Sequence, residues 1–248
     1  EFWYDRLGRL VLSQNAQQSA PSGDGGEPGV RASYTLYDHL SRITEVGQIN
    51  NASPAITNAI SRNPTQLQNW LNSNLARRQQ VTLTVHDQSA KESFLHKDLS
   101  PYIIQQRGNL RNRVSFTLFS KTGDINNYDY AAFYNYDIHG NVDTLLQDYG
   151  ATGLLAQNGG RYKRITYQYD LISGKVNTVS YQPRLYDPVT KKYITQPDAF
   201  YHKYSYDAEN RLTDVYTSTD EVYWEHDAYY VYYKHGPLAR TMLGNRQV

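Results

Sequence analysis

Histidine and aspartate are the side chains of this chain that are best suited to metal binding or proton transfer. The seven histidines are His39, His86, His96, His139, His202, His226 and His235. No two of them form a His-Glu-x-x-His pair, and no spacing among them matches a metal site. Cysteine is absent, so neither a thiolate site nor a disulfide can form. We therefore expect no metal ion, no cofactor and no catalytic residue.

Aspartate recurs in one setting, directly after a tyrosine. The five dyads are Tyr4-Asp5, Tyr37-Asp38, Tyr136-Asp137, Tyr169-Asp170 and Tyr206-Asp207. The first two aspartates are 33 residues apart, as are the third and the fourth. Five chemically equivalent aspartates are a poor way to build one catalytic acid, whereas a fixed period is the signature of a repeat array. We expect these aspartates to be structural and the protein not to be an enzyme.

The residues around each dyad indicate a β-hairpin. In Tyr-x-Tyr-Asp the two tyrosines fall on one face of a strand, because side chains alternate along it. The aspartate begins the turn by accepting hydrogen bonds from later amides, and a Gly or Asn further on takes left-handed backbone. A pair such as Arg-Leu opens the returning strand, and its arginine can lie over a tyrosine ring across the same hairpin. The repeat-motif residues are Tyr4, Asp5, Gly8, Arg9, Tyr37, Asp38, Arg42, Tyr134, Tyr136, Asp137, Gly140, Tyr167, Tyr169, Asp170, Gly174, Tyr204, Tyr206, Asp207 and Arg211.

The long interval between Asp38 and Asp137 has room for three copies at the short spacing. One candidate is Thr84-Val85-His86-Asp87, with histidine in the tyrosine slot. Another is Asn112-Arg113-Val114, which matches only the second half of the motif. A last, eroded copy runs from residue 230 to 236 and lacks the aspartate. Because a lone two-stranded hairpin is marginally stable, we expect the copies to stack.

These copies resemble the YD-repeat, or Rhs, family over most of the chain. The later copies, including residues 134–143 and 235–240, are similar to very large Rhs-type proteins of Bacteroidota. The family includes Rhs toxins, the C component of insecticidal toxin complexes, and teneurins. The resemblance implies a long β-sheet that spirals into a hollow shell, often around a toxic C-terminal domain. We expect a mainly β fold of stacked hairpins, part of such a shell, with one or two short inserted helices.

Two polar segments interrupt the copies. Residues 13–33 are rich in Gln, Ser, Gly and Pro and are predicted to form a flexible loop, with a protease-sensitive tether as the alternative. Residues 184–203 are predicted to be an inserted turn segment. Their Arg184-Leu185-Tyr186-Asp187-Pro188 stretch resembles the core motif that ends many Rhs shells. Another copy follows it at Tyr204, so self-cleavage does not carry over, and we expect a turn at Asp187-Pro188.

A third interruption, residues 50–80, has helical periodicity. Asn63 followed by Pro64 is a helix start, and apolar residues then recur at helical spacing. They are Leu67, Trp70, Leu71 and Leu75. The helix either packs on the sheet or serves as a plug or partner-docking helix. A second short helix is predicted around residues 99–107.

Net charge and apolar content limit the classes of function that the chain can have. The 248 residues carry a net charge of +1, which gives no electrostatic footprint for nucleic acid, and no run of about 18 apolar residues occurs. We interpret residues 1–248 as one shell segment, a fragment of a longer polypeptide that is secreted or lies on a bacterial cell surface. Its expected partners are the remainder of that polypeptide, including an enclosed C-terminal domain, with secretion machinery as a further candidate. The alternative is an adhesion or glycan-binding module that uses some of the 24 tyrosines, which would then be exposed in one patch.

Overall fold

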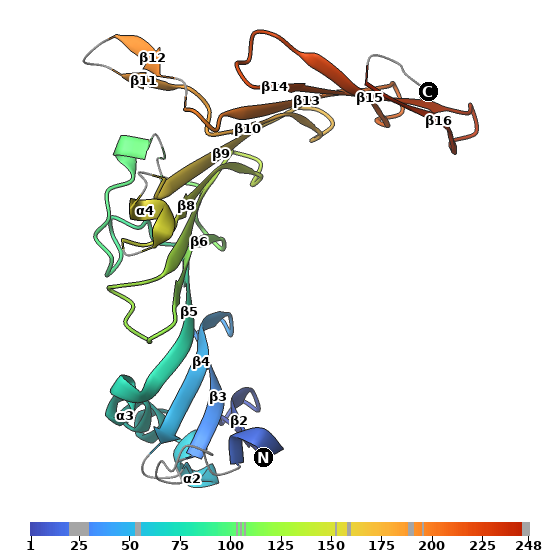
Figure 1. Ribbon diagram of the computed structural model, residues 1–248. Helices are drawn as coiled ribbons and strands as arrows, with labels where there is room; N and C mark the ends of the chain where they lie inside the picture. The colour runs from blue at the N-terminus through green and yellow to red at the C-terminus, as the bar shows by residue number, and fades with distance from the viewer. Residues whose placement is uncertain are drawn as a thin grey trace. The chain divides into compact units, whose positions relative to one another are not determined.

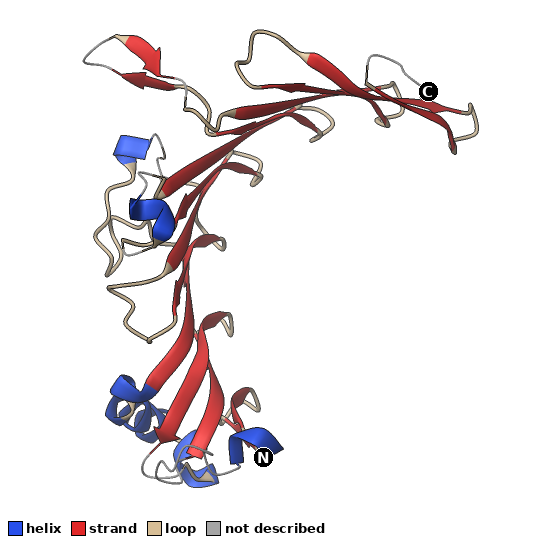
Figure 2. Cartoon of the chain, in the orientation of Figure 1, coloured by secondary structure: helices blue, strands red, loops and turns tan. Residues whose placement is uncertain are grey.

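The computed structural model describes residues 1–19, 30–52, 56–102, 104, 106, 108–151, 153–157, 160–187, 191–194 and 196–244. The predicted mainly β fold is confirmed. In these residues fourteen strands form one open antiparallel meander, in which each strand pairs with the strands before and after it (Figures 1 and 2). The sheet runs from β1 to β10 and continues from β13 to β16, and a separate two-stranded sheet pairs β11 with β12.

The strands are 3 to 10 residues long. They are β1 (Phe2–Tyr4), β2 (Leu10–Ser13), β3 (Val30–Tyr37), β4 (Ile43–Ala52), β5 (Arg78–His86), β6 (Val114–Ser120), β7 (Tyr130–Tyr136), β8 (Val142–Asp148), β9 (Tyr162–Tyr169), β10 (Val176–Tyr181), β11 (Leu185–Asp187), β12 (Lys192–Ile194), β13 (Phe200–Tyr206), β14 (Leu212–Ser218), β15 (Glu225–Tyr232) and β16 (Leu238–Leu243). The helices are α1 (Ala16–Ser19), α2 (Asn58–Arg62), α3 (Pro64–Ser73) and α4 (Leu154–Gln157), with short 3₁₀ turns η1 (Leu75–Arg77) and η2 (Ser100–Tyr102).

The chain divides into two compact units. The first comprises residues 1–99, 106–133 and 147–161, and the second comprises residues 100–105, 134–146 and 162–248. Figure 1 shows α2 and α3 beside the strands β3 to β5 of the first unit. The second unit has few buried apolar side chains among those described, namely Ile104, Leu146, Tyr201 and the small residues Ala199 and Ala228.

Helix α3 begins and packs as the residue pattern predicts. The Asn63 side chain accepts hydrogen bonds from the amides of Thr65 and Gln66, and Pro64 occupies the first turn. Leu67, Trp70 and Leu71 are buried in one cluster with residues of β1 to β4. Full burial of each such side chain stabilises the fold by roughly 1.5–3 kcal/mol. The helix therefore packs on the sheet, which is the first of the two interpretations given for it.

The edges of this insertion differ from the predicted 50–80 range. Strand β4 extends to Ala52 and β5 begins at Arg78, so both ends of the predicted segment belong to paired strands. Leu75 lies beyond α3, in η1, and is 55% exposed. Among the described residues of the 99–107 range, helical structure is confined to the single turn η2.

The interval between Asp38 and Asp137 has room for three copies, and its described residues contain one further motif hairpin. Strands β5 and β6 pair, and the Asp87 amide donates to the Arg113 carbonyl at 3.2 Å. The Asp5 amide makes the same bond to the Arg9 carbonyl at 2.9 Å. The two degenerate copies around Asp87 and Arg113 are therefore the two halves of one hairpin, separated by a long insertion at the turn.

Three other segments predicted from the sequence contain a helix or strands. The 13–33 segment contains α1 and the start of β3, and its residues 20–29 lie outside the described part of the chain. The 184–203 segment forms the hairpin β11–β12 and the start of β13, and Pro188 lies outside the described residues. The eroded last copy forms the hairpin β15–β16, in which Tyr233 takes the place of the aspartate and its amide donates to the Pro237 carbonyl.

Candidate functional site: the hairpin turns

Each motif aspartate closes its own turn. Asp5 Oδ1 accepts hydrogen bonds from the amides of Leu7 and Arg9, at 2.8 and 2.9 Å, and Oδ2 accepts from Arg9 Nε at 2.7 Å. Asp38 and Asp207 make the same three bonds to the residues two and four positions later. A carboxylate that is held in this way by two amides and a guanidinium is committed to the turn.

Two turns vary the same scheme. At Asp137 the side-chain amide of Asn141 replaces the arginine, at 2.9 Å from Oδ2. At Asp170 the loop is one residue longer, and the Ser173 hydroxyl donates to Oδ1 at 2.8 Å. The scheme therefore tolerates any short donor that reaches back to the aspartate.

The residue three or four positions after the aspartate adopts left-handed backbone. Gly8, Gly140 and Gly174 have φ angles of +78°, +96° and +68°. In the second hairpin a serine, Ser41, occupies this slot with φ +63°. A left-handed conformation costs a non-glycine residue about 1–2 kcal/mol, which explains the frequent glycine.

A β-bulge follows every motif turn whose strand register is defined. Tyr4 pairs with Leu10 and Trp3 pairs with Leu12, so that Val11 is an extra residue on the returning strand. Five other hairpins, with turns at residues 38, 87, 170, 207 and 233, shift register at the same point. Bulges increase the local twist of a sheet, so each hairpin adds twist beside its turn.

The tyrosine before the aspartate bonds to the preceding hairpin. The Tyr37 hydroxyl donates to the Leu10 carbonyl at 2.9 Å. Tyr169, Tyr206 and Tyr232 donate in the same way to the carbonyls of Val142, Val176 and Leu212, at 2.9, 2.7 and 2.9 Å. We call this contact the hydroxyl lock. In every case the acceptor is the first residue of the returning strand of the hairpin before.

The motif arginine also reaches the next hairpin, which corrects the predicted stacking within one hairpin. The Arg9 guanidinium lies 4.6 Å from the ring centroid of Tyr37, and Arg211 lies 4.7 Å from that of Tyr232. Arg9 Nη1 also donates to the Asp38 carbonyl at 3.3 Å. The arginine stacks forward because its side chain is held to the turn aspartate and extends toward the following turn.

The remaining motif tyrosines lie within the strands. Tyr134 and Tyr136 are half-buried on β7, as are Tyr204 and Tyr206 on β13. The rings of Tyr167 and Tyr169 are stacked with centroids 6.4 Å apart, as expected for residues two apart on one strand face.

Hydrogen bonding sets the charge of the turns. Burial raises the pKa of Asp5, but the amide and guanidinium of Arg9 outweigh it, so the pKa is below its ordinary value. The same balance lowers the pKa of Asp38, Asp137 and Asp207. For Asp170 the Ser173 amide is the main cause of the lowered pKa. These carboxylates are therefore ionised at neutral pH and unsuited to donate a proton.

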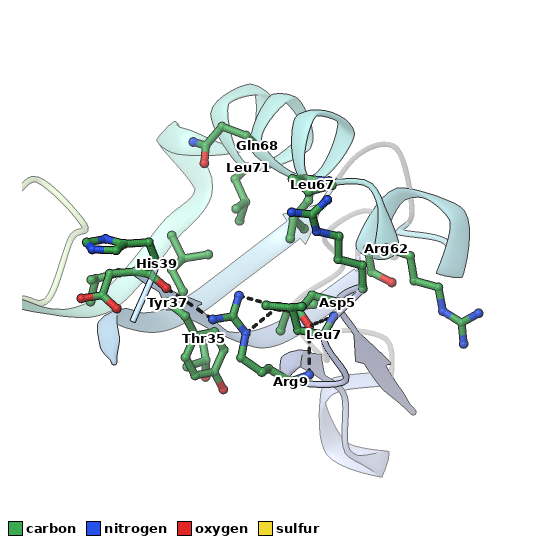
Figure 3. Close-up of a pocket in the computed structure, with 17 residues that line it drawn as sticks. Asp5, Leu7, Arg9, Thr35, Tyr37, His39, Arg62, Leu67, Gln68 and Leu71 are labelled. Carbon is green, nitrogen blue, oxygen red and sulfur yellow. Dashed lines mark hydrogen bonds and ion pairs between the residues drawn. The ribbon is translucent and has the colours of Figure 1, made fainter. Parts of the chain in front are cut away.

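A hollow of about 520 Å³ lies between the first two turns and the helices α2 and α3 (Figure 3). Its floor includes Tyr37, Leu67 and Leu71, and Arg62 and His39 lie on its rim. Figure 3 shows Arg9 bonded to Asp5 inside the hollow. The two aspartates that line it, Asp5 and Asp38, are held by their own turns.

Two buried ionic clusters have no counterpart in the sequence motif. Asp148 is fully buried and accepts from Tyr128 at 2.6 Å, from Arg161 at 2.7 Å and from Lys97. Because Lys97 belongs to the insertion between Asp87 and Arg113, this cluster attaches the insertion to the sheet. These residues are isolated in sequence, and nothing in their spacing predicts the contact.

The second cluster joins strands β3, β4 and β5. Glu45 accepts from Arg78 Nη1 at 2.6 Å and from the Tyr34 hydroxyl at 2.5 Å. Burial, followed by the bond to Glu45, raises the pKa of Tyr34. This hydroxyl therefore stays protonated and serves as a permanent donor.

The described residues show neither a metal-binding cluster nor a membrane-spanning helix. Among the described residues no three His, Asp or Glu side chains are grouped so that they could hold a metal ion. No helix in the described ranges is long and apolar enough to cross a membrane. His39 and His139 lie in turns, as the motif predicts.

The fold and its turns describe one class of structure, an open meander of β-hairpins in which aspartates close the motif turns. No family model and no curated protein matches the chain. Solved structures that resemble it include a porin-like protein from Bacteroides uniformis, with 8% identity, a TM-score of 0.33, and coverage of 86% of this chain and 58% of that one.

Two further matches are components of Tc toxin complexes, at low identity. The Photorhabdus luminescens Tc holotoxin pore matches with 12% identity and a TM-score of 0.35, over 97% of this chain and 12% of that one. The complex of TcdB2 and TccC3 matches with 10% identity and a TM-score of 0.24, over 96% and 12%. The chain thus spans between 12% and 58% of the proteins it matches.

Proposed function

We propose that this chain is a non-catalytic structural segment of a secreted or surface protein of the YD-repeat type, whose β-sheet encloses or displays another domain. The observation that carries the proposal is the hydroxyl lock. A tyrosine of one hairpin bonds the backbone of the hairpin before it, at four places with the same geometry. Repeated links between neighbours are what an array needs, because each hairpin alone buries too little apolar surface.

The chemistry of the turns supports a structural role. Their aspartates accept several hydrogen bonds from their own turns, and their arginines contact the next hairpin. The motif aspartates thus close their own turns, and the motif arginines Arg9 and Arg211 contact the next hairpin. A site that binds substrate would instead leave such groups open to a cleft.

The two edges of the sheet indicate the partner. Strands β1 and β16 each pair on one side only, and Phe2 and Leu243 on them are about two-thirds exposed. Tyr4 occupies the lock position, yet its hydroxyl bonds no described residue. We propose that further hairpins of the same polypeptide pair with these edges, since open edge strands invite pairing.

The glycan-binding alternative needs a contiguous patch of exposed tyrosines. Tyr4, Tyr193, Tyr223 and Tyr233 are the tyrosines at least 45% exposed among those described. They lie on β1, on β12, in the loop after β14 and in the last turn, so no two share a strand. This distribution favours a structural segment of the sheet over a recognition surface.

Protection of a neighbouring domain tests the proposed function. Tyr37, Tyr169, Tyr206 and Tyr232 would be changed together to phenylalanine in the full-length protein that contains this chain, and limited proteolysis would follow cleavage of the domains outside it. We expect faster cleavage than in the wild type, with Tyr223→Phe as the matched control. Unchanged protection in a variant shown to be less stable would refute the enclosing role, and specific binding of the wild-type chain on a glycan array would favour the alternative.

A further inference from the structure

Arg164, on β9 in the second compact unit, is a buried cation without an acidic partner among the described residues. The residue is 8% exposed. Within the described part of the chain its Nη1 and Nη2 donate to the carbonyls of Tyr102 and Pro183, at 3.4 and 3.5 Å, which is at the long limit for hydrogen bonds. Its Nε has no hydrogen-bond partner among the described residues. Most of the bonding capacity of this guanidinium is therefore unused.

The other buried arginine of the chain shows the usual arrangement. Arg78 is also 8% exposed, and its Nη1 bonds Glu45 at 2.6 Å. None of the ion pairs in the described ranges includes Arg164, and burial lowers its pKa with no carboxylate to oppose the effect. Because a guanidinium stays charged at any ordinary pH, Arg164 cannot relieve its burial by losing a proton. Such a cation requires an anion from elsewhere.

The backbone around Arg164 is hydrogen-bonded to the 182–184 segment. The Arg164 backbone amide donates to the Gln182 side chain at 2.7 Å, and the Gln182 amide donates back to the Arg164 carbonyl at 2.7 Å. Two positions on, the Arg184 amide donates to the hydroxyl of the buried Tyr201 at 3.2 Å. The Nε of Arg184 is also buried and has no partner among the described residues. Arg164, which contacts this segment at Pro183, and Arg184 within it thus each have an Nε without a partner among the described residues.

We infer that Arg164 is the anchor of a binding site for a carboxylate group, which enters between Tyr102 and the 182–184 segment and displaces the two long carbonyl contacts. A carboxylate matches the two parallel donors of a guanidinium and would restore the charge balance. No acid occurs among the residues outside the described part at 103–107 and 188–195, which are Ile103, Gln105, Arg107, Pro188, Val189, Thr190 and Thr195. The carboxylate therefore comes from a small acid or from an Asp or Glu of another segment. The inference does not depend on the proposed function.

Thermal unfolding of the whole chain tests this site. Sodium acetate would replace sodium chloride at constant ionic strength, and the melting temperature of the wild type is expected to rise along a saturable curve, since a ligand of the folded state stabilises it by mass action. Arg164→Met is expected to abolish the response, and Arg164→Lys, which keeps the charge and loses the paired donors, to weaken it at least several-fold. Arg111→Met is the matched control, because Arg111 is exposed.

A short Asp-containing peptide with blocked termini forms the second arm. Tighter binding of the peptide than of acetate would indicate a protein carboxylate, and equal or weaker binding a small acid. An acetate response that persists in Arg164→Met, or a wild type that responds to neither probe, would overturn the inference.

Discussion

Removing the hydroxyl locks one at a time should weaken the fold in equal steps. Each of Tyr37→Phe, Tyr169→Phe, Tyr206→Phe and Tyr232→Phe deletes one bond of 2.7–2.9 Å to a backbone carbonyl and leaves the ring in place. A neutral hydrogen bond of this kind contributes about 0.5–1.5 kcal/mol net. No two of the four bonds share a donor or an acceptor residue, so the losses should add to about 2–6 kcal/mol in the quadruple variant.

Urea unfolding followed by circular dichroism measures these losses, and the chain supplies its own control. Tyr4 occupies the same position in the motif, but its hydroxyl donates to no described residue, so Tyr4→Phe should change the unfolding free energy by less than about 0.5 kcal/mol. If the four other variants were as stable as Tyr4→Phe, the hydroxyl lock would contribute nothing, and the stacking of the hairpins would need another cause.

Three further predictions concern other parts of the fold. Gly47→Ala should cost about 1–3 kcal/mol, because an added Cβ would lie 2.8 Å from the Tyr34 hydroxyl oxygen, and calorimetry should find the cost removed in a Tyr34→Leu background. Asp148→Ala should cost about 3 kcal/mol in urea unfolding, the lower end of the range for a broken buried pair, because Lys97 and Arg161 keep some solvent contact; a loss under 1 kcal/mol would contradict the cluster. The pKa values of the turn aspartates are lowered by folding, so their stabilisation is complete above the unfolded pKa near 3.8 and is lost as the pH falls below it; acid titration of the melting temperature should show this loss reduced in Asp137→Asn, and an unchanged profile would contradict it.

The local geometry of each hairpin could be predicted from its own residues. The strand-forming tyrosines, the aspartate that accepts from later amides and the left-handed slot are decided within a few residues of one another, so the motif contains the information. Helix α3 was predictable for the same reason, because Asn63, Pro64 and the spacing of Leu67, Trp70 and Leu71 are all local.

Contacts between hairpins could not be predicted in this way. The partner of Tyr37 depends on the register between β2 and β3, in which Leu12 pairs with Tyr34. No residue in the motif specifies this pairing between hairpins, in which the Tyr37 hydroxyl bonds Leu10 and Arg9 stacks on the tyrosine of the next hairpin instead of its own. The hairpin at Asp87 was predicted as two separate copies for a related reason, because an insertion in its turn separates its two halves in sequence.

The buried charges show the same limit. Asp148 meets Lys97 across an interval of 51 residues, and Arg164 meets the 182–184 segment across a strand pair. Neither contact leaves a periodic signal, because each occurs once and depends on how an inserted segment folds back on the sheet.

Hydrogen exchange at the amides of β1 and β2 tests most directly whether the hairpins continue as one array beyond this chain. Tyr4→Phe would be compared in the isolated chain and in the full-length protein. The account predicts no change in the isolated chain and exchange about two- to tenfold faster in the full-length protein, where the Tyr4 hydroxyl bonds a preceding hairpin. Equal exchange rates for wild type and variant in the full-length protein would contradict it.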